Sequence, residues 1–304
     1  MLRRKIWLVA ALLHLNCGSI RKLFNLIISY IRKNKFLKIY EIKEKQMKTA
    51  EEYKKSINSL KKNVYMDGEV VGRDDPKLAP GVNTVCLTYD AQHSDEKIRE
   101  LATATSHLTG KTISRFAHMH QGVEDLLKKQ EMTRLLCHKT GTCILRCMGI
   151  DALNALSVAT HEVDQKKGTD YHQRFLKYLE YFQENDIAGT CAQTDVKGDR
   201  RLRPHQQSDP DLYVRIVEKR PDGIIVKGAK AHITMAAIAE EIIVVPTRVM
   251  TPDDADWAVA FAIPADTEGV KLVTLGKYPI QRKNLHAPFP TFGSCDSMVL
   301  FDNV

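Results

Sequence analysis

The sequence predicts an α+β fold in which a helical region precedes a β region. From Thr49 to Asn185 the apolar residues recur three or four positions apart, as on one face of a helix. Beyond Ile187 they alternate or form short apolar runs separated by turn residues. Helices followed by strands indicate two packed units and not a doubly wound sheet. We therefore divide the chain into residues 1–46, an N-terminal helical domain over 47–187 and a middle antiparallel β domain over 188–304.

The first helix is expected to begin at Thr49, because the run Thr49-Ala-Glu-Glu52 has the form of a capping box. Apolar side chains then follow at helical spacing, at Tyr53, Ile57, Leu60 and Val64. A loop is expected over Lys77–Asn83, because this segment contains Pro80 and Gly81 and follows Pro76. Further helices are expected over Ser94–Gly110, Gln121–Cys137, Cys143–Lys166 and Asp170–Asn185.

Alternating apolar residues predict a β-hairpin after Leu212. A strand over Leu212–Glu218 is followed by the turn Arg220-Pro-Asp-Gly223 and a second strand over Ile224–Lys227. Further strands are expected over Glu241–Val249, Trp257–Ile263 and Val270–Leu275. A last apolar strand, Ser297–Val304, runs to the final residue without a cap or polar tail. We therefore expect a C-terminal part to be missing.

The positive charge is concentrated at the N-terminus. The formal net charge is +8, but residues 1–46 contain eleven Lys or Arg against only Glu41 and Glu44. Residues 47–304 contain 34 basic and 35 acidic residues, so no nucleic-acid partner is expected. The seven cysteines are an odd number without paired spacing. This argues against a disulfide framework and predicts a reducing, cytoplasmic location.

Residues 1–46 need an interpretation of their own. Arg3, Arg4 and Lys5 precede an apolar run over Ile6–Leu13 that is too short to span a bilayer. Because the composition changes at Met47, we expect an upstream stretch that is not part of the functional core. The alternative is a targeting or membrane-surface helix. No membrane partner is expected for the core.

Cys143 and Cys147 follow the helix-breaking run Lys139-Thr-Gly-Thr142 and lie one helical turn apart. In a helix they would point to the same side. Thiolates are soft ligands suited to zinc, copper or iron–sulfur clusters, but two supply only half of a four-ligand shell. The alternative is a pair of small, buried, reduced cysteines that pack a helix. The spacing alone leaves both interpretations open.

A polar segment from Ala188 to Arg200 joins the two predicted domains. Its glycine, hydroxyl and amide residues can place backbone N–H groups against a ring system or a pyrophosphate, or they form a polar linker. Thr234 lies at an expected strand end, where its hydroxyl can meet a ring nitrogen or belong to a routine turn. The sequence has no Walker loop, His-Glu-x-x-His motif, Gly-x-Ser-x-Gly elbow or Gly-x-Gly-x-x-Gly fingerprint.

Arg115, His118 and His120 form another polar cluster, around an expected turn. No carboxylate lies within the segment Arg115–His120 to pair with them. We therefore expect these three side chains on a solvated face, without a functional role.

Three motifs carry a resemblance to a known family. They are Cys137-His-Lys-Thr-Gly-Thr-Cys-Ile-Leu-Arg-Cys147, Gln193-Thr-Asp-Val-Lys-Gly-Asp-Arg200 and Lys227-Gly-Ala-Lys-Ala-His-Ile-Thr234. Over Met47–Val304 the chain resembles the N-terminal and middle parts of the 4-hydroxybutyryl-CoA dehydratase/vinylacetyl-CoA isomerase family, which is related to the flavin-dependent 4-hydroxyphenylacetate 3-hydroxylases. The resemblance implies an acyl-CoA dehydrogenase-like fold whose C-terminal helical bundle is missing here.

The resemblance also implies two cofactors, FAD and a 4Fe–4S cluster. In the dehydratase family a cysteine pair with this spacing binds the cluster, which maps onto Cys143 and Cys147. The remaining cluster ligands and the catalytic residues belong to the C-terminal domain, so no catalytic residue is assigned here. The positions that match the FAD contacts of the family are Gln193, Thr194, Asp195, Val196, Lys197, Gly198, Asp199, Arg200 and Thr234.

The implied reaction converts 4-hydroxybutyryl-CoA to crotonyl-CoA, with vinylacetyl-CoA isomerase activity. In the family the flavin is thought to oxidise the CoA thioester transiently, which makes an unactivated β-proton acidic, while the cluster acts as a Lewis acid on the hydroxyl. The implied assembly is a homotetramer. With two cluster ligands this chain alone is expected to be inactive. The alternatives are a flavin-dependent aromatic monooxygenase, which shares the fold but lacks the cluster, and an inactive truncated product.

Overall fold

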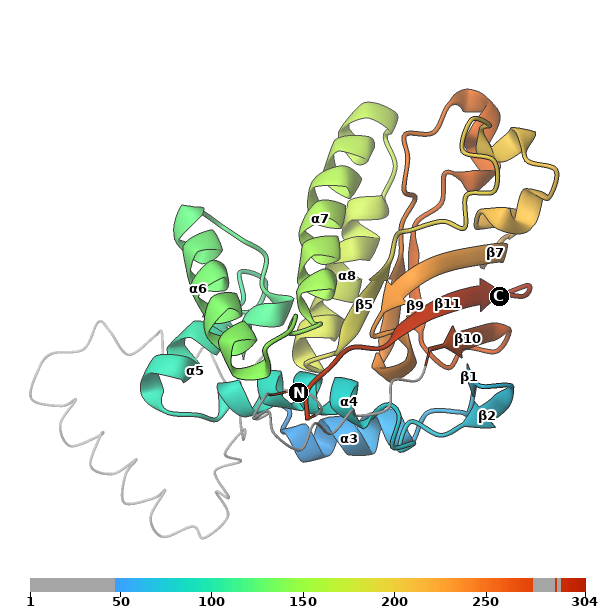
Figure 1. The fold of residues 1–304 in the computed structure, drawn as a ribbon. Coiled ribbons are helices and arrows are strands. Elements are labelled where there is room, and N and C mark those ends of the chain that lie inside the picture. The colour runs from blue at the N-terminus through green and yellow to red at the C-terminus, as the bar shows by residue number, and fades with distance from the viewer. Residues whose placement is uncertain (1–46, 276–287, 289–290) are drawn as a thin grey trace, which may run out of the picture. The chain divides into compact units, whose positions relative to one another are not determined.

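The computed structural model describes residues 47–275, 288 and 291–304, and these are shown in colour in Figure 1. The upstream stretch and the targeting helix considered for residues 1–46 therefore lie outside the described residues. Across the described part, no helix combines the length and the apolar character needed to cross a membrane.

Helices fill most of the first half of the described chain. The first of them, α3, begins with the capping box that the sequence predicts, because Thr49 and Glu52 each accept a hydrogen bond from the backbone N–H of the other. The helices are α3 (Ala50–Asn58), α4 (Ala79–Gln92), α5 (Glu96–Ala102), α6 (Val123–Thr140), α7 (Cys147–Lys167) and α8 (Tyr171–Glu184), with the 3₁₀ turn η2 (Arg115–Ala117) before α6.

Two helical expectations are wrong. The loop expected over Lys77–Asn83 is helical from Ala79 onward, because Pro80 lies in the first turn of α4, where its missing N–H leaves no helical bond unmade. The helix expected over Ser94–Gly110 ends at Ala102 and gives way to a short hairpin of β3 (Thr103–Thr105) and β4 (Thr112–Ser114). β-branched threonines favour the extended chain there.

The strands form two further sheets. In the larger sheet the order is β2-β1-β10-β11-β7-β6, and in the smaller it is β5-β8-β9. The strands are β1 (Val64–Met66), β2 (Glu69–Val71), β5 (Gly189–Ala192), β6 (Arg215–Arg220), β7 (Gly223–Thr234), β8 (Glu241–Val244), β9 (Phe261–Pro264), β10 (Val270–Thr274) and β11 (Asp296–Phe301). The predicted hairpin after Leu212 is confirmed by the antiparallel pair β6–β7.

The expectation of a purely antiparallel β domain is wrong in two places. β5 pairs with β8 in parallel, and β1 pairs with β10 in parallel, with Val64 opposite Leu272. β1 begins at Val64, the last residue of the apolar pattern that predicted the first helix, and the hairpin β1–β2 was not predicted. The missed signal is the dipeptide Asp67-Gly68, whose positive φ values of 52° and 86° suit a tight hairpin turn.

The core positions α7 and α8 against the smaller sheet. Figure 1 shows the two helices side by side next to β5. Leu153 of α7 and Phe182 of α8 are buried in one cluster with Ile243 of β8. At the start of α7, Gly149 approaches the backbone of Gly189 so closely that a Cβ would lie 2.6 Å from the Gly189 carbonyl oxygen. The N-terminal end of α7 is therefore held against the beginning of β5.

Candidate functional site

The segment Cys143–Cys147, here called the cysteine turn, brings two sulfur atoms together without being one turn of a helix. α7 begins only at Cys147, so the helix expected from Cys143 starts too early. Leu145 adopts a left-handed backbone conformation with φ of 67°. The Sγ atoms of Cys143 and Cys147 lie 3.4 Å apart. Because Cys143 is exposed, the alternative of two buried core cysteines is wrong too.

The pKa values of the two thiols are shifted in opposite directions. The hydrogen bond from Cys147 lowers the pKa of Cys143 to about 6, and the backbone N–H of Leu145 adds a second bond at 3.4 Å. The same pairing, together with burial, raises the pKa of Cys147 well above the usual range. The lowered pKa of Cys143 favours the thiolate, which is the form that binds metals.

The cysteine turn fits part of a metal site. Two sulfurs bound to one tetrahedral ion lie about 3.8 Å apart when each metal–sulfur bond is about 2.3 Å. The observed 3.4 Å is close to that spacing, and cysteines of a cluster, which bind different irons, would have to separate further. Over the described ranges, no group of three or more His, Cys, Asp or Glu side chains is placed to hold a metal ion. The turn thus offers two soft donors at an accessible position.

Arg146 anchors the cysteine turn in the interior. It is 2% exposed, and its guanidinium lies 4.2 Å from the ring centroid of Tyr89 and 4.9 Å from that of Phe116. One of its nitrogens donates to the carboxylate of Asp186 at 2.8 Å and to the carbonyl of Ile187 at 3.2 Å. The turn is therefore fixed to the segment that leads into β5.

The first half of the loop Gln193–Arg200, here called the 193–200 loop, is held by a buried ion pair. The ammonium of Lys230 lies 2.5 Å from the carboxylate of Asp195, and both side chains are 2% exposed. Lys230 also donates to the backbone carbonyls of Gln193 and Val245 at 2.9 and 2.8 Å. Thr247 accepts the backbone N–H of Asp195 at 3.1 Å. These contacts fix the backbone conformation of the loop at Gln193 and Asp195.

The second half of the loop is fixed by Gln207, which lies in the connection before β6. Its side-chain carbonyl accepts the backbone N–H of Asp199 at 3.1 Å, and its amide donates to the Asp199 carbonyl at 2.8 Å. Gly198 has φ of 51°, and a Cβ there would lie 2.4 Å from the Gln207 oxygen. The left-handed backbone conformation favours glycine at this position.

Thr234 lies on β7, the strand that also carries Lys230. The backbone N–H of Ala231 donates to the Thr194 carbonyl at 2.8 Å, so β7 runs beside the start of the loop. The Thr190 hydroxyl donates to the Thr234 carbonyl at 2.7 Å, and the Thr234 hydroxyl donates to Asp296 at 2.7 Å. The structure thus brings Thr234 next to β5 and the first residues of the loop, although its assigned contact with FAD stays a prediction.

The 193–200 loop offers polar groups on a rigid frame. The side chains of Gln193 and Arg200 are exposed and make no hydrogen bond to any residue in the described part of the chain. One carboxylate oxygen of the buried Asp195 likewise has no partner among those residues. An exposed amide, an exposed guanidinium and a fixed backbone fit the edge of a polar, anionic cofactor such as FAD.

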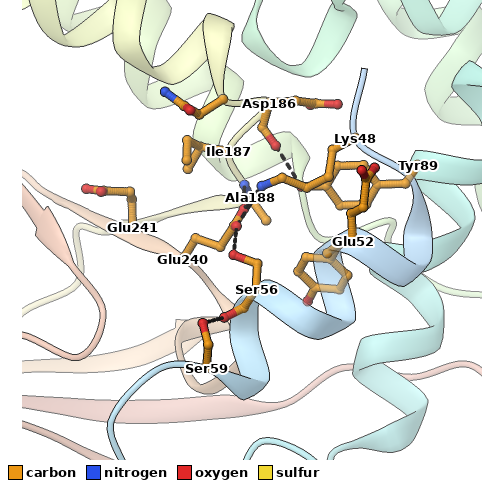
Figure 2. Close-up of polar contacts among 12 residues, drawn as sticks. Lys48, Glu52, Ser56, Ser59, Tyr89, Asp186, Ile187, Ala188, Glu240 and Glu241 are labelled. Carbon is orange, nitrogen blue, oxygen red and sulfur yellow. Dashed lines mark hydrogen bonds and ion pairs between the residues drawn. The ribbon is translucent and has the colours of Figure 1, made fainter. Parts of the chain in front are cut away.

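A second buried network joins α3 to the same region. Figure 2 shows Glu240 between Lys48, Ser56 and Ala188. The carboxylate of Glu240 accepts hydrogen bonds from Lys48 at 2.6 Å, from the Ser56 hydroxyl and from the backbone N–H of Ala188 at 2.8 Å. Tyr89 donates its hydroxyl to the Asp186 carbonyl at 2.9 Å. Residues 186–188 are therefore bonded from both sides, by Arg146 and by Glu240.

Glu241, the neighbour of Glu240, faces α8. Burial raises the pKa of the Glu241 carboxyl to about 7, although the Tyr181 hydroxyl donates to it at 3.3 Å. Its side chain is 5% exposed. At neutral pH this carboxyl is therefore partly protonated.

Sequence reasoning missed Arg146, Lys230 and Glu240, which position the site. Each is a charged residue inside an otherwise apolar or small-residue run, such as Ala236–Ala239 before Glu240. Charges are rarely buried unless they are paired, so a charge in such a run is a signal for a buried ion pair. The sequence gives no means of naming the partners, which come from distant segments.

The solvated cluster expected at Arg115, His118 and His120 is wrong. Arg115 and His118 are buried, and Asp125 on α6 lies 3.7 Å from Arg115 and 3.8 Å from His118. Arg115 also donates to the carbonyls of Leu101 and Thr103, each at 2.6 Å. The carboxylate was missed although Asp125 follows His120 by only five residues. These residues tie η2 to α5 and α6.

Comparison with known proteins places this geometry in a family. The chain is 46% identical over 263 residues to the 4-hydroxybutyryl-CoA dehydratase/vinylacetyl-CoA-Δ-isomerase of Clostridium aminobutyricum. The aligned region covers 84% of this chain and 54% of the Clostridium protein. A solved oxygen-tolerant archaeal 4-hydroxybutyryl-CoA dehydratase from N. maritimus is similar with a TM-score of 0.80 and 37% identity, over 85% of this chain and 52% of the other.

The oxygenase component of 4-hydroxyphenylacetate 3-monooxygenase, solved in complex with FAD, is similar with a TM-score of 0.67 and 27% identity, over 84% of this chain and 53% of the other. The chain spans about half the length of the curated relatives it matches. The mixed helix and sheet fold is shared with both groups of solved structures. Residues 49–304 match the family described as 4-hydroxyphenylacetate 3-hydroxylase N terminal, and the chain therefore belongs to this family.

Proposed function

We propose that this chain forms part of a FAD- and iron–sulfur-dependent dehydratase that converts 4-hydroxybutyryl-CoA to crotonyl-CoA and isomerises vinylacetyl-CoA. The single observation that carries the proposal is the cysteine turn, in which the sulfurs of the exposed Cys143 and the half-buried Cys147 lie 3.4 Å apart. The 46% identity to the Clostridium aminobutyricum enzyme supports the same reaction. We further propose that the architecture is acyl-CoA dehydrogenase-like.

Cys143 and Cys147 would supply two ligands of a 4Fe–4S cluster. The lowered pKa of Cys143 favours the thiolate that such a ligand needs. Cys147 would lose its proton when iron binds, since metal ligands compete with protons for the same lone pairs. The exposure of Cys143 leaves this side of the turn open for the cluster and for ligands from other segments.

The 193–200 loop and Thr234 would hold FAD. The ion pair between Lys230 and Asp195 and the two hydrogen bonds from Gln207 fix the backbone of the loop before the cofactor arrives. Such preorganisation reduces the ordering cost of binding. Gln193 and Arg200 remain available for direct contacts, and the cation of Arg200 suits a pyrophosphate.

The reaction requires removal of a proton from a β-carbon that is not acidic by itself. When bound, the flavin supplies transient oxidation of the CoA thioester and the cluster supplies Lewis acidity at the hydroxyl that leaves as water. The residues of this chain orient these groups. Arg146 bonds the cysteine turn to Ile187, two residues before β5, and the 193–200 loop directly follows the end of β5.

Anaerobic purification followed by assays of iron, acid-labile sulfide and FAD tests the proposal. We expect iron, sulfide and FAD together in the full-length enzyme, and release of water from 4-hydroxybutyryl-CoA. FAD without iron or sulfide, in protein that never met oxygen, would contradict the dehydratase assignment. That outcome would instead favour a flavin-dependent monooxygenase, the other activity found among the relatives of this chain.

A further inference from the structure

We propose that Arg146 is the positioning residue that anchors the backbone of the cysteine turn, and with it the Cys143 and Cys147 sulfurs, to residues 186 and 187 before β5. The part of this proposal that concerns iron rests on the proposed function, whereas the geometry of the two thiols does not. Arg146 would not touch the cluster or the substrate. It would act through the backbone of the cysteine turn.

The first support is the depth of the anchor. The Arg146 side chain is 1% exposed and the Asp186 side chain 7%. Its guanidinium is held by two aromatic rings, a carboxylate, a backbone carbonyl and the Thr88 hydroxyl at 3.4 Å. Arginine combines a delocalised cation that stacks on rings with donors in a fixed planar array, and lysine cannot reproduce both.

The second support is the backbone strain at the neighbouring residue. Leu145 has φ of 67°, which L-residues with a Cβ rarely adopt unless the surrounding structure imposes it. Leu145 is itself fully buried. Its backbone N–H donates to Cys143, so the strained conformation is the one that closes the turn. Arg146 follows directly, and its buried guanidinium holds the chain in this conformation.

The third support is the route from the anchor to the 193–200 loop. Asp186 and Ile187 accept hydrogen bonds from Arg146. The next residue, Ala188, donates its N–H to Glu240, and Figure 2 shows these two residues. β5 begins one residue later, at Gly189, and ends at Ala192, directly before the 193–200 loop. Arg146 thus joins the cysteine turn to the base of the strand that carries the proposed flavin contacts.

Phenylarsine oxide tests the geometry, because trivalent arsenic binds two thiols only when they lie close together. Two S–H groups are exchanged for two As–S bonds, one water is released, and no oxidation occurs. The measurement is the affinity of the reduced, iron-free chain for this probe. All variants would carry Cys137→Ser, because the half-buried Cys137 lies at the end of α6, shortly before the turn.

Arg146→Met should weaken probe binding by about tenfold or more, on the scale of losing a contact that orients metal ligands. Arg146→Lys should restore little of the affinity. The matched control is Arg174→Met, since Arg174 also pairs with an aspartate at 2.8 Å and lies 5.6 Å from a tyrosine ring centroid, but on the surface. Arg174→Met should leave the affinity unchanged.

Wild-type affinity for the probe in folded Arg146→Met would overturn the proposal. If Arg146→Met fails to fold, Asp186→Asn replaces it, because this substitution removes the charge partner and keeps the shape of the side chain. Unchanged probe affinity in folded Asp186→Asn would then overturn the proposal as well. Iron content of the full-length enzyme after anaerobic reconstitution separates the two claims. Absence of iron in the full-length wild type rejects the proposed function, whereas equal iron in the full-length wild type and variant rejects the role of Arg146.

Discussion

Gly149 and Gly189 meet backbone to backbone, and this contact sets how closely α7 approaches β5. A Cβ on residue 149 would lie 2.6 Å from the Gly189 carbonyl oxygen, which no side chain can do without displacing one backbone. A Cβ on residue 189 would lie 2.7 Å from the Phe182 ring. Glycine at residue 149 allows the helix that starts at Cys147 to lie against this strand, and glycine at residue 189 leaves room for Phe182 of α8.

Gly149→Ala should therefore destabilise the protein. The added methyl group must push the start of α7 away from β5, and overpacking of this kind costs about 1–3 kcal/mol. The measurement is the free energy of unfolding from urea titration. Gly223→Ala is the matched control, because a Cβ on residue 223 meets nothing within 4 Å. Equal stabilities for the two variants would contradict the close contact.

Asp195→Asn should destabilise the chain and loosen the 193–200 loop. The substitution leaves the Lys230 ammonium buried without its counter-charge, and breaking a buried pair costs about 3–5 kcal/mol. Urea unfolding measures the loss, and flavin fluorescence measures the expected drop in FAD affinity. Asp211→Asn is the control, since Asp211 pairs with Lys227 at a partly exposed site. A loss no larger than that of the control would refute the importance of the buried pair.

Glu241 should make the stability depend on pH. Its pKa is about 7 in the folded protein against an ordinary value of 4.5, so the folded state binds a proton more tightly than the unfolded chain. Stability is therefore full below pH 4.5 and decreases as the pH rises toward 7, by about 3 kcal/mol if the whole shift is realised. Other carboxyl groups add their own pH dependence, so the comparison is between variants.

Glu241→Gln should remove this decrease, so that the variant gains stability over the wild type between pH 5 and pH 8. Urea unfolding at several pH values provides the difference. Glu180→Gln, an exposed change on α8, should follow the wild type. A constant difference between Glu241→Gln and wild type across this range would show that the carboxyl does not titrate as described.

Cys143→Ser and Cys147→Ser should each abolish iron binding and leave FAD binding intact. A serine hydroxyl is a poor soft ligand, and the described contacts of the 193–200 loop include neither cysteine. Iron and flavin are measured on the same anaerobic preparation. Cys137→Ser should retain iron, because Cys137 ends α6 and does not belong to the turn. Retention of iron in either turn variant would contradict the assignment of the ligands.

Local signals predicted the parts of the fold that depend on neighbouring residues. The capping box at Thr49 and the hairpin β6–β7 follow from short runs of sequence and are confirmed. Pro80 misled the prediction, because a proline within a first helical turn and a proline in a loop look alike in sequence. The parallel pairs β1–β10 and β5–β8 depend on contacts between distant segments, which apolar periodicity does not encode.

In the candidate site, too, the sequence predicted local features but not contacts between distant segments. The cysteine spacing indicated two donors on one side, and the sulfurs do meet, but through the left-handed Leu145 and not through a helical turn. The composition of the 193–200 loop pointed to a binding segment, whereas the supports of that loop, Lys230 and Gln207, could not be paired with it in advance. Charge pairing across the fold is a property of the tertiary structure.

The parallel pairing of β1 with β10 has a consequence for how the chain acquires its structure. Val64 and Leu272 are neighbours in the sheet although they lie near opposite ends of the described chain. Such non-local pairing must pay the entropy of closing a very long loop, which slows folding. During synthesis the helices α3 to α8 emerge long before β10. Until β10 is made, the edge of β1 that will pair with it stays unpaired.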